Sequence, residues 1–451
     1  MKRRMSLMML AAFLVCVTLV FAGQAAVGQS KTVKFLTTSG WSLDWMTGIT
    51  ERFIAQHPEV KFEVYAPGID IDFNMAFITK IASEDPPDII KHLITAQTMW
   101  TGFDGQLMDL KPISKERGWD KILIPGWDYN TFGDTSYYIP INSIGVGFYF
   151  TNKDIFDELG LTAANTLEEF YHVAEVLNGA GYGALALGGR PAWPLGHLWA
   201  LLAQRLVGAD KYKKAALSAR PGQPTDVKFT DPDFVNVFAV QGEWGDKGRQ
   251  VIMKGMSAMS REEAREVFLQ GMAGMYSGGT WAINTIIGAA DFKSEMQEYP
   301  NMKAGIPKAL MFEPSQNNIS ISSKSEHKEI LYELIDFMLT KAEQADQLYE
   351  YAVLPVIGLS AEDMARMGKS VDVETAKLLD RIKVSMDLQV GGAPPLSSLA
   401  PGDTVQVLRS AVSMVVLGEI SPEKAAAMVQ ESIESQREIL ASELREKGVK
   451  F

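Results

Sequence analysis

The chain has 451 residues, of which 47% are hydrophobic, 43 are basic and 55 are acidic. Its formal net charge of −12 argues against nucleic acid and anionic membrane as partners, because both repel an acidic surface. The length suggests two or three folding units, and the apolar content is sufficient for a large core.

The first 27 residues have the pattern of a secretion signal. Basic residues at 2–4 precede an apolar stretch at 7–21, and small residues follow at 23–28. We expect cleavage between Ala25 and Gly28. An uncleaved membrane anchor is the alternative, but the apolar stretch is shorter than the roughly 20 residues that a spanning helix needs.

The single cysteine, Cys16, lies within this signal. It follows Val15, whereas a lipoprotein signal has a small residue before its cysteine. The mature protein is therefore expected to have no disulfide and no lipid anchor, and to be a free periplasmic protein. No later segment has the length and apolar character of a membrane span.

After the signal, the pattern predicts alternating strands and helices. Residues 33–37 alternate as a strand does, and Trp45, Ile49 and Phe53 recur every four residues, as on a buried helix face. A second strand follows at 60–64, and the pattern repeats as far as 85–90. This βαβαβ order predicts a parallel sheet with ligand-facing loops at the carboxyl ends of its strands.

The most informative stretch lies between 137 and 177. The apolar run at 144–150 predicts a buried strand, and Asn152 is placed to cap a short helix. Gly160 suits a left-handed end of that helix. Thr166 and Glu169 then have the spacing of a capping box that opens a second helix.

This stretch resembles the extracellular solute-binding proteins of family 1, the sugar-binding components of ABC importers. The family pattern is Pro, strand, Tyr-Asn-Lys-Asp-hydrophobic, Gly-Leu and Thr-x-x-Glu-hydrophobic. Its counterparts here are Pro140, Asn152-Lys153-Asp154-Ile155-Phe156, Gly160-Leu161 and Thr166-x-x-Glu169-Phe170, with Thr151 in place of the usual Tyr. Further similar blocks include Pro87-Asp88-Ile89-Ile90, the segment 268–275 and Gly278-Gly279-Thr280-Trp281.

The resemblance implies an α/β, two-lobed periplasmic-binding-protein fold of class II type, in which the lobes exchange segments and share a hinge of several strands. We place the first lobe at 31–141 plus 303–343 and the second at 142–302 plus 344–451. The chain would cross between them near Pro140 to Ser143, near Asn301 to Pro307 and near Thr340 to Glu350.

Patterns typical of enzymes are missing from the sequence. It contains no HExxH, no GxSxG and no phosphate-binding loop that ends in Gly-Lys-Ser/Thr. The five histidines include no pair at the i,i+4 spacing of a metal site. We expect neither catalysis, nor a cofactor, nor a bound metal.

Three of the nine tryptophans lie where a cleft beside the sheet would place them. Trp41 follows the first strand, Trp193 lies in a glycine- and proline-rich loop, and Trp281 follows Gly278 and Gly279. An aromatic ring on a loop suits a sugar, whose C–H face packs on it. A structural core position is the alternative for each ring; the resemblance favours ligand contact for Trp281, which matches a position that commonly stacks on sugar.

Four polar residues are candidates for hydrogen bonds to sugar hydroxyls. Asp44 follows the first loop, and His92 follows the third strand. Asn142 lies at the first crossover, and Asn317 precedes the return strand. Many family members have a carboxylate near the position of Asn142, so the ligand of any one relative does not transfer directly.

The resemblance therefore implies a secreted, monomeric protein that captures a sugar or oligosaccharide between its lobes and delivers it to an ABC permease. One alternative is the same fold binding a polyol, a glycerol phosphate ester or another small solute, with Arg190 as the candidate for a phosphate. A second alternative is a secreted carbohydrate-active hydrolase with two carboxylates about 5–10 Å apart.

Overall fold

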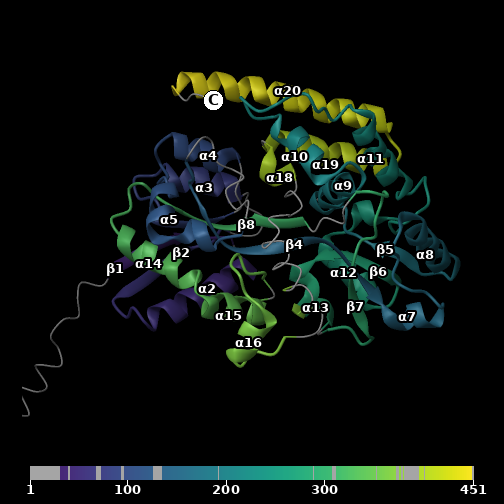
Figure 1. Cartoon of the computed structure of the whole chain (residues 1–451), viewed down its shortest axis with the longest axis horizontal. Helices are drawn as coiled ribbons and strands as arrows, with labels where there is room; N and C mark the ends of the chain where they lie inside the picture. Colours follow the sequence, from purple (N-terminus) through teal and green to yellow (C-terminus); the bar gives the residue numbers. More distant parts are fainter. Residues whose placement is uncertain are drawn as a thin grey trace, which may run out of the picture.

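One eight-stranded sheet runs through the molecule (Figure 1). The computed structural model describes residues 31–38, 41–67, 73–92, 96–124, 135–190, 192–287, 289–306, 311–351, 353–371, 375–376, 379, 396–400, 402–448 and 451. The strand order is β2-β1-β3-β8-β4-β6-β5, and β7 pairs with β4. The strands are β1 Lys31–Leu36, β2 Val60–Tyr65, β3 Ile89–His92, β4 Ile139–Asn152, β5 Gly183–Ala186, β6 Ala273–Gly279, β7 Ser294–Glu298 and β8 Met311–Ile321.

The amino-terminal strands form the predicted parallel βαβαβ unit. β1 is parallel to both β2 and β3. Because side chains alternate along a strand, Phe35 packs on one face of the sheet with Trp45 and Leu36 packs on the other with Phe77. The predicted helix face of Trp45, Ile49 and Phe53 is fully buried, which confirms that reading of the sequence. Together these two apolar clusters form what we call the first core.

Helices cover both faces of this part of the sheet (Figure 1). α2 and α14 lie on the face of Phe35, and α3 lies on the face of Leu36. The helices around the first core are α2 Trp41–Ile54, α3 Phe73–Ile81, α4 Ala96–Phe103, α5 Lys111–Arg117, α6 Trp119–Ile122 and α14 Lys328–Met338. The next helix, α15 Lys341–Tyr351, contributes Ala345 and Leu348 to the apolar cluster around Phe150 and Phe268.

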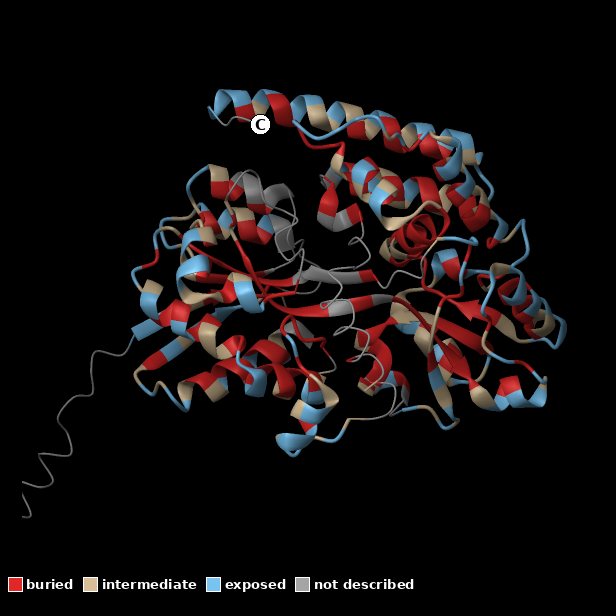
Figure 2. Cartoon of the chain, viewed as in Figure 1, coloured by how far each residue is buried: buried red, intermediate tan, exposed pale blue. Residues whose placement is uncertain are grey.

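A second core surrounds the other end of the sheet. It consists of a large cluster around Trp199 and Phe170 and a smaller one around Phe150 and Phe268. Buried residues follow the sheet and the inner faces of the helices, while exposed residues lie outside (Figure 2). The helices here are α7 Lys153–Glu158, α8 Leu167–Gly179, α9 Trp193–Leu206, α10 Ala209–Leu217, α11 Pro232–Glu243, η1 Met256–Ala258, α12 Arg261–Leu269, η2 Thr280–Ala282, α13 Ile283–Ile287, α16 Ala361–Arg366, α18 Leu396–Leu399, α19 Gly402–Val416 and α20 Pro422–Glu446.

Two long antiparallel strands connect the cores. In β4, Ile139 belongs to the first core and Phe150 to the second. In β8, Met311 belongs to the second core and Ile319 to the first. A third segment joins them where Leu354 exchanges backbone hydrogen bonds of 2.8 and 2.9 Å with Ser143 of β4. The chain therefore passes between the cores in three neighbouring places.

The N-caps predicted between 137 and 177 are present, but the capping box predicted at Thr166 is not closed, because Glu169 accepts from the N–H of Asn165 and not from that of Thr166. The Asn152 side chain accepts hydrogen bonds from the backbone N–H groups of Asp154 and Ile155 at the start of α7. Gly160 has a φ of +68°, which is the left-handed geometry expected at the end of that helix. Thr166 accepts from the N–H of Glu169, whose carboxylate in turn accepts from the N–H of Asn165.

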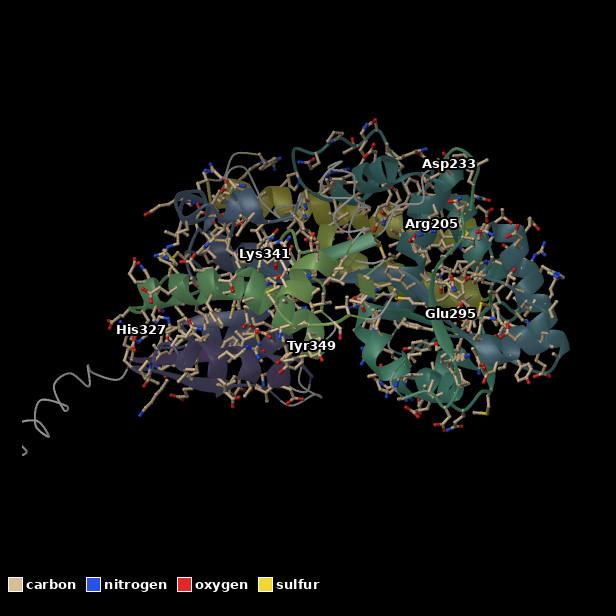
Figure 3. The ribbon with its side chains drawn as sticks, turned by 60° about the horizontal axis from the view of Figure 1, so that its bottom comes forward. Arg205, Asp233, Glu295, His327, Lys341 and Tyr349 are labelled. Atoms are coloured by element: carbon tan, nitrogen blue, oxygen red, sulfur yellow. The ribbon has the colours of Figure 1, made fainter. Side chains whose placement is uncertain are left out.

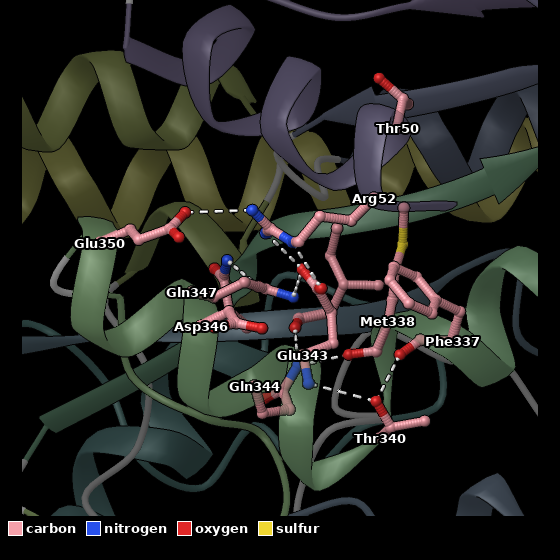
Figure 4. A network of polar contacts seen from close by, with 12 residues as sticks. Thr50, Arg52, Phe337, Met338, Thr340, Glu343, Gln344, Asp346, Gln347 and Glu350 are labelled. Atoms are coloured by element: carbon pink, nitrogen blue, oxygen red, sulfur yellow. Dashed lines mark hydrogen bonds and ion pairs between the residues drawn. The ribbon is translucent and has the colours of Figure 1, made fainter. Parts of the chain in front are cut away.

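An ion pair ties α2 to α15 beside the connecting strands (Figure 4). Arg52 donates to both carboxylate oxygens of Glu343, from Nη2 at 2.7 Å and from Nε at 2.9 Å, and also to Glu350 at 3.0 Å. The Glu343 side chain is 1% exposed, whereas that of Glu350 is 42% exposed. Burial raises the pKa of Glu343, and the paired Arg52 opposes this rise. A fork of two bonds to a buried carboxylate fixes α15 against α2.

We expect the two carboxylates around Arg52 to differ in their contribution to stability. Glu343→Ala removes the buried partner and should lower the free energy of unfolding by about 3 kcal/mol, the low end for a broken buried pair because Arg52 is partly exposed. Glu350→Ala, the matched control, should cost less than about 1 kcal/mol. Urea denaturation of both variants measures the difference, and equal losses would contradict this account.

Candidate functional site

The Gly-Gly-Thr-Trp block after β6 places an indole ring at the end of the sheet. A Cβ at Gly279 would lie 2.1 Å from Cζ3 of Trp281, so the ring lies directly over a backbone that only glycine allows. The Thr280 hydroxyl accepts a 3.0 Å hydrogen bond from the backbone N–H of Gly145 in β4. Strand β4 and Gly279 together fix the orientation of Trp281.

A second indole ring reaches the same place from α9. The loop before this helix is docked on the segment that leads into α12: Gly189 donates to the Met256 carbonyl at 2.8 Å, and Arg190 donates to that of Met259 at 2.9 Å. Trp193, the first residue of α9, then meets Trp281 edge to face, with ring centroids 6.0 Å apart and planes at 65°. Two tryptophans far apart in the sequence thus form one aromatic pair.

The aromatic pair lines a pocket of about 410 Å³, a volume that includes its open mouth. The lining residues come from β4, β6, η2, α9, the start of α12 and the segments that follow β5 and β7. They are Gly147, Leu187, Gly188, Trp193, Pro194, His197, Leu198, Leu201, Arg261, Tyr276, Ser277, Gly278, Trp281 and Tyr299. Gly147 has a φ of +94°, and a Cβ there would lie 2.7 Å from Leu201. A side chain at that position would therefore be strained and crowded.

Two hydroxyl groups lie in the pocket wall. The Tyr299 hydroxyl donates to Ser277 Oγ on β6 at 2.9 Å, and burial raises the pKa of this tyrosine, which keeps it a neutral donor. The backbone around Tyr299 is fixed by Arg205 of α9, labelled in Figure 3, which donates to the carbonyls of Tyr299 and, at 3.1 Å, of Pro300. Arg205 is itself 1% exposed.

His197 lies one helical turn after Trp193, with ring centroids 5.0 Å apart. Burial, with a contribution from the charge of Arg409, lowers the pKa of His197 to about 3. The imidazole is therefore neutral at physiological pH. Its i,i+4 spacing from Trp193 is visible in the sequence, whereas Ser277, Tyr299 and Arg261 come together only through the fold.

The structure corrects the local setting of two of the predicted tryptophans. Trp41 and Trp193 were expected on loops, but each is the first residue of a helix, α2 and α9. Asp44 in the first turn favours an early start for α2 through the helix dipole, and Pro194 favours the first turn of α9. Trp281 lies in the short η2 turn after β6.

The predicted polar residues divide into two groups. Asn142 and Asn317 are buried on the connecting strands, where Asn317 donates to Asn142 at 2.5 Å and Asn142 donates to Gln347 of α15 at 3.2 Å. Asp44 is exposed, and His92 ends β3; the side chains of His92 and Trp41 lie outside the described part. Among the seven predicted residues, contacts are therefore described for Trp193 with Trp281 and for Asn142 with Asn317.

Comparison with protein families gives a match to bacterial extracellular solute-binding proteins over residues 42–345. The chain belongs to this family. The membership confirms that it is a solute-binding protein and not an enzyme. Among the described residues, no helix combines the length and apolar character needed to cross a bilayer.

Two curated relatives of this solute-binding protein have low sequence identity. The multiple sugar-binding protein of Streptococcus mutans is 26% identical over 222 residues, which are 49% of this chain and 51% of the relative. An uncharacterized ABC transporter extracellular-binding protein of Pyrococcus horikoshii is 22% identical over 252 residues, 54% of each chain. The chain thus spans about half the length of the curated relatives it matches.

Solved structures confirm the predicted two-lobed fold. A chitin oligosaccharide binding protein matches with a TM-score of 0.76 and 20% identity, over 91% of this chain and all of the other. An ABC substrate-binding protein of Listeria monocytogenes in complex with cycloalternan matches with a TM-score of 0.69 and 19% identity, over 93% and 100%. A solute-binding protein in complex with raffinose matches with a TM-score of 0.66 and 18% identity, over 90% of this chain and 99% of the other. At these identities the likeness establishes the fold.

The buried His197 makes a prediction for the pH dependence of stability. Its folded-state pKa lies below the ordinary value near 6.5, so the unfolded chain takes up a proton first as the pH falls. The contribution of the neutral His197 to the free energy of unfolding is complete above pH 6.5. It should fall by about 2 kcal/mol between pH 6.5 and pH 5. His197→Gln should lower the number of protons taken up on unfolding in this pH range by about one. The control is His172→Gln, because His172 is exposed. Denaturation at several pH values measures both slopes, and equal slopes would refute the assignment.

Proposed function

We propose that this protein captures a carbohydrate in the cleft between its lobes and delivers it to an ABC importer. The observation that carries the proposal is the Trp193–Trp281 pair at the mouth of a pocket in the second core. Support also comes from three proteins of the same fold. One is named a chitin oligosaccharide binding protein, and the other two are in complex with cycloalternan and with raffinose.

The geometry of the aromatic pair suits a pyranose better than an amino acid or an ion. The two indole planes meet at 65°, so a sugar ring can stack on one face while touching the edge of the other. Ser277 and Tyr299 add hydroxyl groups at the pocket wall. Apolar faces combined with a few fixed polar groups are what a sugar, with its C–H faces and hydroxyl rim, requires.

The connecting strands supply the expected hinge. Pro140 in β4 has no N–H to donate, and the β4–β8 register shifts on both sides of Asn142, so the ladder is irregular between the cores. The boundaries proposed above place 31–141 and 303–343 in one lobe and 142–302 and 344–451 in the other. Rotation at this irregular point would bring the first lobe against sugar held by the second.

Within this scheme we propose that Trp41, Asp44 and His92 supply contacts from the first lobe. All three follow or end strands β1 and β3, at the carboxyl edge of the parallel part of the sheet. Asn142 and Asn317 lie at the floor between the lobes. Their mutual hydrogen bond uses only part of the hydrogen-bonding capacity of each amide, so it does not by itself prevent a contact with a sugar hydroxyl.

The export pattern of residues 1–27 and the position of Cys16 within it support a free periplasmic protein. A soluble carrier that closes around its ligand would present both lobes at once to a membrane-bound permease. We therefore propose the permease of an ABC importer as its protein partner.

Tryptophan fluorescence and melting temperature, measured across a panel of oligosaccharides, monosaccharides and polyols, test the proposal. Binding beside Trp193 and Trp281 should shift the emission saturably, and it should raise the melting temperature by mass action. Unfolding and refolding before the titration removes any sugar that co-purifies. A response to polyols alone, or silence toward every carbohydrate after refolding, would refute the proposal.

A ring substitution locates the binding site. Trp281→Ala should weaken sugar binding by one to two orders of magnitude, because it removes a stacking contact of about 0.5–1.5 kcal/mol together with the apolar area of the ring. Trp281→Phe keeps an aromatic face and should lose only a few-fold. Calorimetric titration of both variants, with melting curves alongside, separates binding from folding. Unchanged affinity in a folded Trp281→Ala protein would place the sugar elsewhere.

A further inference from the structure

Arginine side chains gather around the aromatic pair. Arg261, the first residue of α12, lines the pocket with its guanidinium carbon 5.8 Å from the centre of the Trp193 ring. Arg190 lies in the docked loop just before Trp193. Burial raises the pKa of Tyr276, a lining residue, to about 12, and the positive charges of Arg261 and Arg265 oppose that rise. Three arginines therefore lie close to one pocket of an acidic protein.

The residues that line the pocket include one positively charged side chain and no negatively charged one. Its lining residues include an arginine, a histidine and two tryptophans, but no aspartate or glutamate. Within the described part of the chain, the buried Nε1–H of the lining residue Trp281 has no acceptor. Leaving a buried donor unpaired is unfavourable, so a ligand with a strong acceptor would relieve an existing cost.

Each arginine has a carboxylate partner at present, and each of these pairs is exposed. Arg261 donates to Glu262 at 2.8 Å from Nε, Arg190 lies 3.5 Å from Glu263, and Arg265 donates to Glu266 at 3.2 Å. The three glutamates belong to α12 itself and are more than half exposed. Exposed pairs of this kind contribute little to stability because water screens them, so an anionic ligand can displace them.

We propose that the carbohydrate bound at the Trp193–Trp281 pocket is acidic, with an anionic oxygen group held by Arg261 beside the indole rings. The proposal deepens the function proposed above and depends on it. A sugar carboxylate matches the planar fork of a guanidinium in a way that a hydroxyl does not. Uronic acid oligosaccharides and sugar phosphates share this anionic chemistry, and the experiment distinguishes them.

Calorimetric titration of the protein, expressed as the full chain with its own leader, compares digalacturonate, its neutral counterpart galactobiose, and galactose 1-phosphate. We expect an acidic sugar to bind at least tenfold more tightly than galactobiose, and this preference should shrink as salt is raised from 50 to 500 mM. Preference for digalacturonate would identify a carboxylate ligand, and preference for the phosphate would identify a phosphate ester.

Substitution of one arginine assigns the preference to the pocket. Arg261→Gln should lower the affinity for the acidic sugar at least tenfold more than it lowers the affinity for galactobiose. Arg261→Lys keeps the charge, loses the fork and should give an intermediate loss. Arg366→Gln is the matched control, because Arg366 forms a similar exposed pair with Glu362 on α16.

The outcomes separate this inference from the carbohydrate proposal. Tight binding of neutral sugars, with acidic sugars equal or weaker, would overturn the inference and leave carbohydrate binding intact. An acidic preference that survives in the folded Arg261→Gln protein would also overturn it. Loss of response to every sugar in the wider panel would overturn both.

Discussion

The pairing of β4 with β8 is the interaction on which the rest of the molecule depends. Both strands start in one core and end in the other, so one backbone ladder holds the two halves together. The ladder is interrupted near its middle by Pro140 and by register shifts around Asn142. A continuous ladder would make a rigid body, whereas a ladder with a local irregularity permits rotation while each half keeps its own sheet order. The same strands carry Gly145 and Gly147, which position the pocket, so the hinge and the site are built from one element.

The site residues beside the second core are held in place by well-defined contacts. Trp281 is held by Thr280 and Gly279, Tyr299 by Ser277 and Arg205, and the loop before Trp193 by backbone bonds to 256–259. A preorganised surface loses little conformational entropy when a ligand arrives. Binding can then begin on this surface, and the free energy of the later contacts remains available for closing the lobes.

Much of the fold was predictable because local patterns and tertiary structure agree. The four-residue spacing of Trp45, Ile49 and Phe53, the cap at Asn152 and the glycine at 160 each specify an element by themselves, and the structure contains all of them. Helix starts were less predictable. Trp41 and Trp193 were expected on loops because glycine and proline lie nearby, yet a proline inside the first turn is compatible with a helix.

The site was predictable only in part, since its residues are joined by contacts that no spacing in the sequence reveals. Trp193 and Trp281 could each be selected as aromatic residues near expected strand ends, but their 6.0 Å pairing depends on how α9 packs against β6. Arg261 was not predicted as a site residue, because a charged residue at the start of a helix is usually solvated. Asn142 and Asn317 were predicted as ligand contacts because of their position at a crossover. At such a position the sequence does not distinguish an asparagine that binds a ligand from one that bonds to other residues of the connecting strands. Their hydrogen bonds to each other and to Gln347 show what such residues do in the structure described here: they satisfy one another where the strands cross between the cores. These bonds join side chain to side chain, so the amides satisfy one another and leave the pairing of the strand backbones unchanged.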